Sequence, residues 1–156
     1  MALPILYNSP FEAGVRATFL LRAIFPSSLD LERLLALGHL VVHTSDINGP
    51  PSLHPPTKTH ASEMLVRRDL VERGLSLMQS RALLEKHAAP SGILYRAGAE
   101  SASFVEMLTS EYASELRKCS KYVIDHFGTL SDEQFDQIVT QQLERWAVQF
   151  QPLDTV

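Results

Sequence analysis

The chain has 156 residues, of which 45% are hydrophobic and 21% are charged, and its formal net charge is −4. This composition is typical of one globular domain with its own core, and it excludes a disordered tail or a collagen-like fibre. No apolar run reaches the roughly 18 residues that span a bilayer. The N-terminus lacks a cationic start and a cleavage site, and the single Cys119 excludes an internal disulfide. We therefore expect a cytoplasmic protein with no membrane contact.

The charges are distributed unevenly along the chain. Residues 1–61 have no net charge, residues 62–98 carry +2, and residues 99–156 carry −6. An autonomous DNA-binding protein usually has a dense basic face and a high isoelectric point, whereas the value here is about 5.8. Any contact with DNA is therefore expected to be weak unless a partner adds positive charge.

Two helices are predicted before residue 43. Ser9 is placed to cap the first of them, Pro10 suits its first position, and Glu12 is placed to close a capping box. Pro26 ends this helix, whose apolar stripe repeats every four residues: Phe11, Val15, Phe19 and Ala23. The second helix follows Ser28 and is apolar on nearly every side as far as Val42, which predicts a central, buried element.

A proline-rich segment, residues 45–59, separates these helices from the next one. Its four prolines and the Asn48-Gly49 pair exclude helix and central strand alike. Loops of this length inside a compact domain are more often functional or covered by a partner than idle. We expect an ordered surface loop, with disorder as the alternative.

A third helix and a β-hairpin are predicted next. Residues 62–81 return to helical spacing, although Gly74 argues against one straight helix. Two short extended runs, 82–86 and 93–96, flank a turn at residues 89–92 that contains Pro90 and Gly92, and such a pattern favours a hairpin. Helix, helix and hairpin follow in the order of a winged helix. Residues 1–98 are therefore predicted to form a winged-helix-like domain that contains the loop 45–59.

The remaining residues, 99–156, are predicted to be helical and to pack on the first part as one compact unit. Apolar residues mark a segment around Phe104 and a longer one that ends at Gly128, which is expected to take a left-handed cap. A capping box from Ser131 to Gln134 opens the last helix. The predicted fold is mainly α with a small β-hairpin, a winged-helix-like domain with additional C-terminal helices.

No catalytic constellation is recognisable, so we expect no enzymatic activity, no cofactor and no metal. His39 and His43 are four residues apart, with Asp46 beyond them, and this spacing can place two imidazoles on one metal ion. A third ligand is not evident, and zinc needs three or four, so packing or capping is the favoured interpretation. His54 and His60 are expected at the surface. Cys119 lies within an apolar stripe and is interpreted as a core residue rather than a nucleophile.

Two sets of residues are candidates for contacts with other molecules. In a winged helix the second helix of the motif enters the major groove and the wing contacts phosphates. The DNA-contact candidates are Arg67, Arg68, Arg73, Arg81, Lys86 and Arg96. Acidic neighbours oppose this hypothesis, and a solvated face with pairs such as Asp69 and Arg73 is the plainer interpretation. The partner-contact candidates are Pro50, Pro51, Leu53, Pro55, Trp146 and Phe150, although the two aromatic residues also fit a core.

Several stretches give the chain a family resemblance. The most specific are Asn8-Ser-Pro-Phe-Glu12, within residues 7–16, and Gly49-Pro-Pro-Ser-Leu-His-Pro55. Further stretches are Leu34-Leu-Ala-Leu-Gly-His-Leu-Val-Val-His43, Leu65-Val-Arg-Arg-Asp-Leu-Val-Glu-Arg-Gly74, Arg81-Ala-Leu-Leu-Glu85 and Tyr95-Arg-Ala-Gly98. With them the chain resembles, from about Tyr7 to Gly128, the middle component of bacterial ABC-three-component systems, and it is similar to the accessory subunit of Lamassu-type antiphage defence complexes.

This resemblance implies a non-catalytic adaptor. The expected partners are an ATPase that resembles structural-maintenance-of-chromosomes (SMC) or Rad50 proteins and an effector, often a nuclease, with a weak contact to double-stranded DNA through the complex. The alternative hypothesis is a stand-alone winged-helix transcription regulator that binds a specific duplex. The acidic isoelectric point favours the adaptor.

Overall fold

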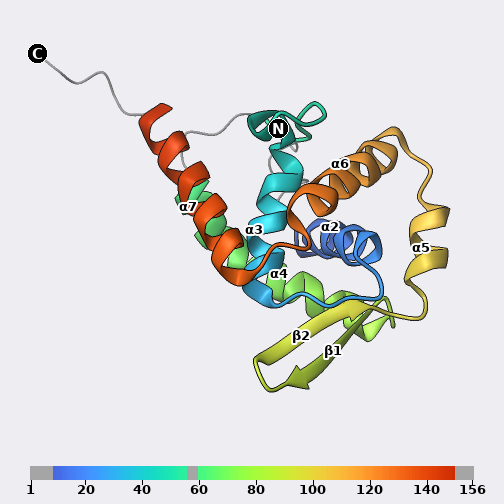
Figure 1. Ribbon diagram of the computed structural model, residues 1–156. Helices are drawn as coiled ribbons and strands as arrows, with labels where there is room; N and C mark the ends of the chain where they lie inside the picture. The colour runs from blue at the N-terminus through green and yellow to red at the C-terminus, as the bar shows by residue number, and fades with distance from the viewer. Residues whose placement is uncertain (1–8, 56–59, 150–156) are drawn as a thin grey trace, which may run out of the picture.

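The computed structural model describes residues 9–55 and 60–149, with the side chains of 60–66 and 142–149 left out of the description. The elements, labelled as in Figure 1, are α2 (Pro10–Ala23), α3 (Leu31–Val42), η1 (Thr44–Ile47), α4 (His60–Ser80), β1 (Leu84–Ala89), β2 (Gly92–Ala97), α5 (Ser101–Met107), α6 (Glu111–Phe127) and α7 (Asp132–Gln149). The expected mainly helical fold with one β-hairpin is confirmed. No helix of the described residues is both long enough and apolar enough to cross a membrane.

Helix starts follow the capping residues closely. The Ser9 hydroxyl accepts a hydrogen bond from the Glu12 backbone N–H at 3.1 Å, and Pro10 begins α2 as predicted. At α7 the predicted capping box is complete, since Ser131 and Gln134 each bond the backbone N–H of the other. The second helix begins later than expected, at Leu31, because Asp30 provides the cap by accepting from the Arg33 N–H.

The buried face of α2 differs from the predicted stripe. Phe11 is 56% exposed and Ala23 is exposed, whereas Phe19 is buried. α2 packs against α4, α6 and α3, so its buried surface is wider than a single stripe and is displaced from Phe11. The buried residues are Ala13, Gly14, Arg16, Ala17, Thr18, Phe19, Leu20 and Leu21.

The close crossing of α2 and α4 depends on two glycines. A Cβ on Gly74 would lie 2.5 Å from the Pro10 carbonyl oxygen and 2.6 Å from the Gly14 nitrogen, and one on Gly14 would lie 2.7 Å from the Gly74 oxygen. α4 is one continuous helix through Gly74, although this glycine argued against one straight helix. Gly74 serves close packing between backbones rather than a break.

The hairpin is present, with strand boundaries that differ from the predicted ones. β1 and β2 pair in antiparallel register from Leu84 opposite Ala97 to Ala89 opposite Gly92. Ala82 lies outside the strand because its φ is +59° and the chain turns there after α4. Leu29, between α2 and α3, forms an antiparallel bridge with Tyr95 and so adds a short second pairing, on the other side of β2.

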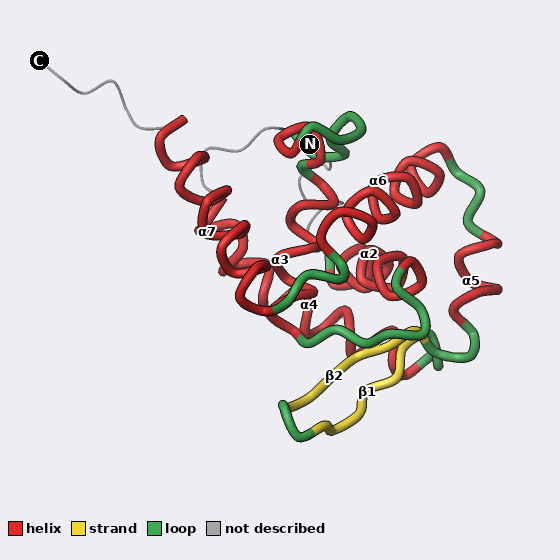
Figure 2. Tube along the Cα trace, in the orientation of Figure 1, coloured by secondary structure: helices red, strands yellow, loops and turns green. Residues whose placement is uncertain are grey.

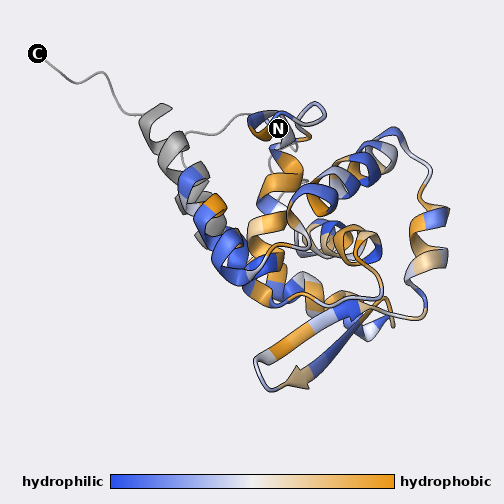
Figure 3. Ribbon diagram, viewed as in Figure 1, coloured by the Kyte–Doolittle hydropathy of each residue, from blue (hydrophilic) through white to orange (hydrophobic). Residues whose placement is uncertain are grey.

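One hydrophobic cluster joins both halves of the chain. It contains α3, which Figure 3 shows as largely apolar, together with residues of α2, α4, the hairpin and α6. Leu116, Cys119 and Val123 of α6 are completely buried within it. At the end of α6, Gly128 has φ −69°, so the predicted left-handed cap is wrong; the position needs a small residue because a Cβ would lie 2.7 Å from the Ile124 oxygen.

Candidate interaction surfaces

Residues 44–55 form an ordered segment beside the helices, which we call the platform (Figure 2). The Thr44 hydroxyl donates to the Pro50 carbonyl at 2.7 Å, and the Gly49 N–H donates to the Thr44 carbonyl at 2.9 Å. The Tyr122 hydroxyl of α6 donates to the Ile47 carbonyl at 2.8 Å. The described part of this segment is therefore ordered, as expected, and it contains one 3₁₀ turn, η1, that was not predicted.

The partner-contact candidates on this platform differ in exposure. Pro51 and Pro55 are exposed, Pro50 is half-buried, and Leu53 is half-buried because it packs against the core. The platform therefore presents two prolines to solvent in a fixed arrangement. Residues 56–59, the rest of the predicted loop, lie outside the described residues.

Buried polar side chains from α2, α3 and α4 meet beneath the platform. His54 is only 6% exposed, so its predicted surface position is wrong. Arg67 is 8% exposed, and its guanidinium Nη2 donates to the ring Nδ1 of His54 at 3.0 Å. The backbone N–H of His54 donates to the Val42 carbonyl at 3.1 Å. These two bonds attach the end of the platform to α3 and α4.

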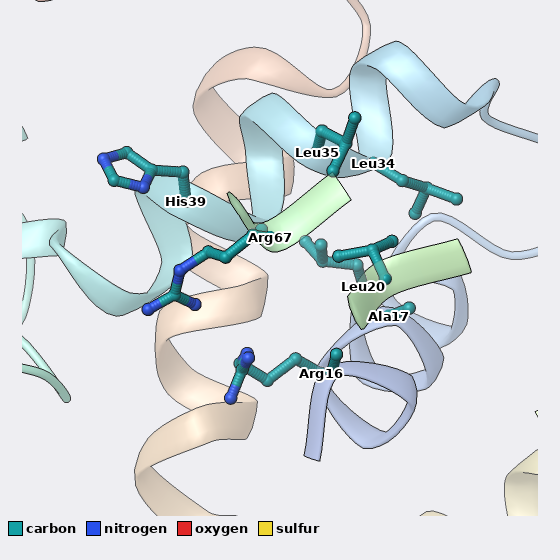
Figure 4. A pocket seen from close by; sticks show the side chains of 10 residues that line it. Arg16, Ala17, Leu20, Leu34, Leu35, His39 and Arg67 are labelled. Atoms are coloured by element: carbon teal, nitrogen blue, oxygen red, sulfur yellow. The ribbon is translucent and has the colours of Figure 1, made fainter. Parts of the chain in front are cut away.

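Figure 4 shows the centre of this cluster, where Arg16, His39 and Arg67 surround a cavity of about 20 Å³. That volume holds about one water molecule, so the cavity is not a ligand site. Arg16 Nη1 lies 3.6 Å from Glu12 Oε2. Burial raises the pKa of the Glu12 carboxyl, and the charges of Arg16 and Arg67 partly offset this rise.

The pair with metal-ligand spacing belongs to the same buried region. The rings of His39 and His43 have centroids 4.7 Å apart, and both residues are at most 2% exposed. Asp46 lies in η1, where its backbone N–H donates to the His43 carbonyl. Among the side chains that the structure describes, those of residues 9–55 and 67–141, no group of three or more His, Cys, Asp or Glu is arranged to hold a metal ion.

Cys119 is fully buried in α6, as predicted for a core residue. Its Sγ lies 3.5 Å from the Thr44 hydroxyl and 3.9 Å from the Pro51 carbonyl oxygen. Burial raises the pKa of this thiol, which opposes formation of the nucleophilic thiolate. The Cys119 side chain therefore lies against two residues of the platform, Thr44 and Pro51.

The DNA-contact candidates are separated by the fold. Arg67 is buried in the cluster just described, and its guanidinium faces the core rather than solvent. Arg68 and Arg73 are exposed on α4, and the other three candidates are exposed at the end of α4 and on the hairpin: Arg81, Lys86 and Arg96. Five of the six DNA-contact candidates therefore lie at the surface, and Arg67 does not.

Several of these cations already form ion pairs with carboxylates of the chain. Arg68 Nη1 lies 2.6 Å from a carboxylate oxygen of Glu32 in α3, which also raises the pKa of Arg68. Arg73 pairs with Asp69 at 3.6 Å, as the spacing predicted, and Arg96 pairs with Glu85 across the hairpin at 2.6 Å. These carboxylates lower the net positive charge of the face, although such exposed pairs are individually weak.

An arginine of α3 and a buried phenylalanine hold the start of α7. Arg33 Nη2 donates to the Leu130 carbonyl at 2.7 Å and to Asp132 Oδ1 at 2.8 Å, and its guanidinium lies over the Phe135 ring at 4.6 Å. Phe135 is buried, which confirms the beginning of the predicted apolar stripe. Beyond this point Val139 packs against the core cluster, and α7 contacts α4. The side chain of Trp146 and the whole of Phe150 lie outside the described residues.

A second surface, which we call the α5 groove, was not predicted from the sequence. It is an open groove of about 480 Å³ between the start of α2, the end of α4 and α5, lined by Phe11, Leu77, Met78, Arg81, Leu83, Glu100, Ser103, Phe104 and Met107. Met107 is 79% exposed. In the sequence, the apolar residues around Phe104 indicated only a helical segment.

The structure is that of a small, mainly helical protein with one β-hairpin, an ordered segment at 44–55 and an open groove beside α5. Residues 6–149 match the family described as ABC-three component (ABC-3C) system Middle Component 2. The chain therefore belongs to this family, which confirms the resemblance to a middle component. No curated protein and no solved structure gives a significant match. Membership indicates an accessory role in a multi-component system and implies partner subunits.

Proposed function

We propose that this chain is a non-catalytic adaptor that bridges an SMC- or Rad50-like ATPase and an effector, such as a nuclease, in an antiphage defence complex of the Lamassu type. The observation that carries the proposal is the match to the middle-component family over residues 6–149. The platform at 44–55 supports it, because a surface whose backbone is already fixed loses little conformational entropy when a partner binds. The proposed site of action is the cytoplasm.

Co-expression tests this function directly. The full chain is produced with the products of the reading frames next to its gene, and the masses of the purified species are measured by light scattering. We expect a stable complex that contains a coiled-coil ATPase. A chain that stays monomeric beside that ATPase contradicts the proposal.

The platform prolines provide a sharper test of the same function. Pro51→Asp and Pro55→Asp replace exposed side chains, so the variants should fold. Their affinity for the co-expressed subunits should fall. Pro90→Asp at the exposed hairpin turn is the matched control. Equal losses for all three variants would show that the platform is not the docking surface.

A weak DNA contact through α4 and the hairpin is a second part of the proposal. The elements α2, the Leu29 bridge, α3, α4 and the hairpin follow one another in the order of a winged helix, in which α4 would face the major groove of DNA. The segment between α3 and α4 is longer than the turn of a helix-turn-helix motif, and it is the main departure from that comparison. We expect DNA affinity to be low for the chain alone and to increase in the complex.

The alternative, a stand-alone transcription regulator, rests on the same element order. Titration of the purified chain with duplex DNA at several salt concentrations separates the two functions. Tight binding by the chain alone to one specific duplex, with a salt slope that decreases in Arg73→Gln and Lys86→Gln, would favour the regulator. Weak binding without sequence preference favours the adaptor.

A further inference from the structure

The α5 groove has the composition of a helix-binding surface. Its base is formed by buried Met78 and Leu83 with half-buried Leu77 and Phe104, and exposed Met107 borders it. Methionine side chains adapt to different apolar shapes and are common on surfaces that receive partner helices. A contiguous apolar hollow of this kind on a soluble protein indicates an interaction site.

The walls of the groove are held in place by the backbone. The Gly98 N–H donates to the Leu83 carbonyl at 2.9 Å, and the Glu100 N–H donates to the Ala82 carbonyl at 3.3 Å. A Cβ on Gly98 would lie 2.4 Å from the Ala82 oxygen, so the two segments are in tight contact. The groove is therefore largely formed before a partner arrives, which lowers the cost of binding.

Two opposite charges line the groove. Arg81 and Glu100 are both exposed, and neither takes part in an ion pair with the residues that the structure describes. The arginines farther along α4 and on the hairpin, in contrast, are matched by carboxylates of this chain. A ligand that carries one carboxylate and one cation beside an apolar stripe would complement both groups.

The described surface of a second copy of this chain does not provide that ligand. Among the described side chains, the large apolar residues that are exposed are Phe11, Phe25, Ile93 and Met107. Two of these line the groove itself, and the other two lie on the α2–α3 connection and on the hairpin. The described helix faces that remain exposed are polar, as on α6 and the start of α7, so none offers an apolar stripe to fill the groove.

We propose that the α5 groove binds an amphipathic helix of a partner subunit. The helix presents apolar side chains at positions i, i+3 or i+4, and i+7 to the groove, a carboxylate to Arg81 and a lysine or arginine to Glu100. This inference rests on the proposed adaptor function, because it assumes a partner subunit. It adds the surface that receives the partner and the chemistry of the segment received.

Binding of groove variants to the co-expressed ATPase and effector subunits tests the inference. Phe11→Glu and Met107→Glu change exposed side chains, and we expect each to weaken binding about tenfold or more without lowering the melting temperature. Phe25→Glu and Ile93→Glu are matched controls, since they place the same charge on exposed apolar residues elsewhere. They should bind like the wild-type chain.

Arg81→Glu tests the charge complementarity. It should weaken binding, and a reciprocal Glu→Lys or Asp→Lys change in the partner helix should restore it. A photoreactive phenylalanine analogue at position 107 then identifies the occupant by mass spectrometry of the cross-linked peptide. We expect that peptide to lie in an amphipathic helix of the ATPase or the effector.

The outcomes separate this inference from the function on which it rests. Wild-type binding that groove variants leave unchanged overturns the groove alone, and the adaptor function stands. Cross-links to a second copy of this chain, or to an extended segment, also overturn the groove alone. If the wild-type chain binds no subunit, both proposals fail.

Discussion

The platform at 44–55 and the hairpin at 84–97 are both exposed connections, yet they are held in different ways. The platform is fixed by bonds that reach into the core, from Arg67 to His54 and from Tyr122 to Ile47. The hairpin projects into solvent beyond its base (Figure 2). Its two strands are joined at the surface by the side-chain pair of Arg96 and Glu85. Proline content therefore says little about rigidity, which depends on whether the segment has buried partners.

The largest effect is expected from the buried arginine beneath the platform. Arg67→Met removes the charged donor to buried His54, and we expect the free energy of unfolding to fall by about 2–3 kcal/mol. Arg68→Met is the matched control at the next position, where the guanidinium is exposed and solvent screens its pair with Glu32. Urea unfolding measures both. Similar losses would contradict the distinction between the two residues.

A smaller effect is expected where α6 holds the platform. Tyr122→Phe removes the hydroxyl that donates to the Ile47 carbonyl, which should lower the free energy of unfolding by about 1 kcal/mol. Hydrogen exchange should show faster exchange of the Gly49 amide, which is bonded within the platform, and unchanged exchange in the hairpin. Uniform acceleration in both segments would mean that the platform is not an independently held unit.

The hairpin should be less sensitive. Arg96→Gln breaks the surface pair with Glu85, and we expect a loss of at most about 0.5 kcal/mol that disappears at high salt. Denaturant unfolding at low and high ionic strength measures it. A salt-independent loss as large as that of Tyr122→Phe would remove the contrast between the two segments.

The smallest effect concerns pH. Burial raises the folded-state pKa of Glu12 above its unfolded value, so ionisation of this carboxyl lowers the stability of the fold. The stability that the protonated carboxyl contributes is complete at acid pH and is lost as pH rises through the folded-state pKa. In Glu12→Gln this decrease should be absent, so stability relative to the wild-type chain should improve from pH 4 towards pH 7. Parallel stability–pH profiles for the two proteins would contradict this.

Local signals in the sequence were sufficient for most of the elements. The caps at Ser9 and Ser131 and the turn at Pro90 and Gly92 placed two helix starts and the hairpin, because these signals act within a few residues. Errors occurred where the cause was distant in the chain. Gly74 marks a contact with Gly14 of another helix, and His54 is buried because Arg67 of α4 bonds to it.

The sequence by itself determined a helical protein with one hairpin and the stretches that carry its family membership. Only the tertiary structure decided which surfaces those elements present: Arg67 and His54 are buried together, and Phe11 lies beside Met107 on the α5 groove. The physical reason is that helical spacing shows which residues share a face. Which faces are covered depends on helices that are far away in the chain and close in space.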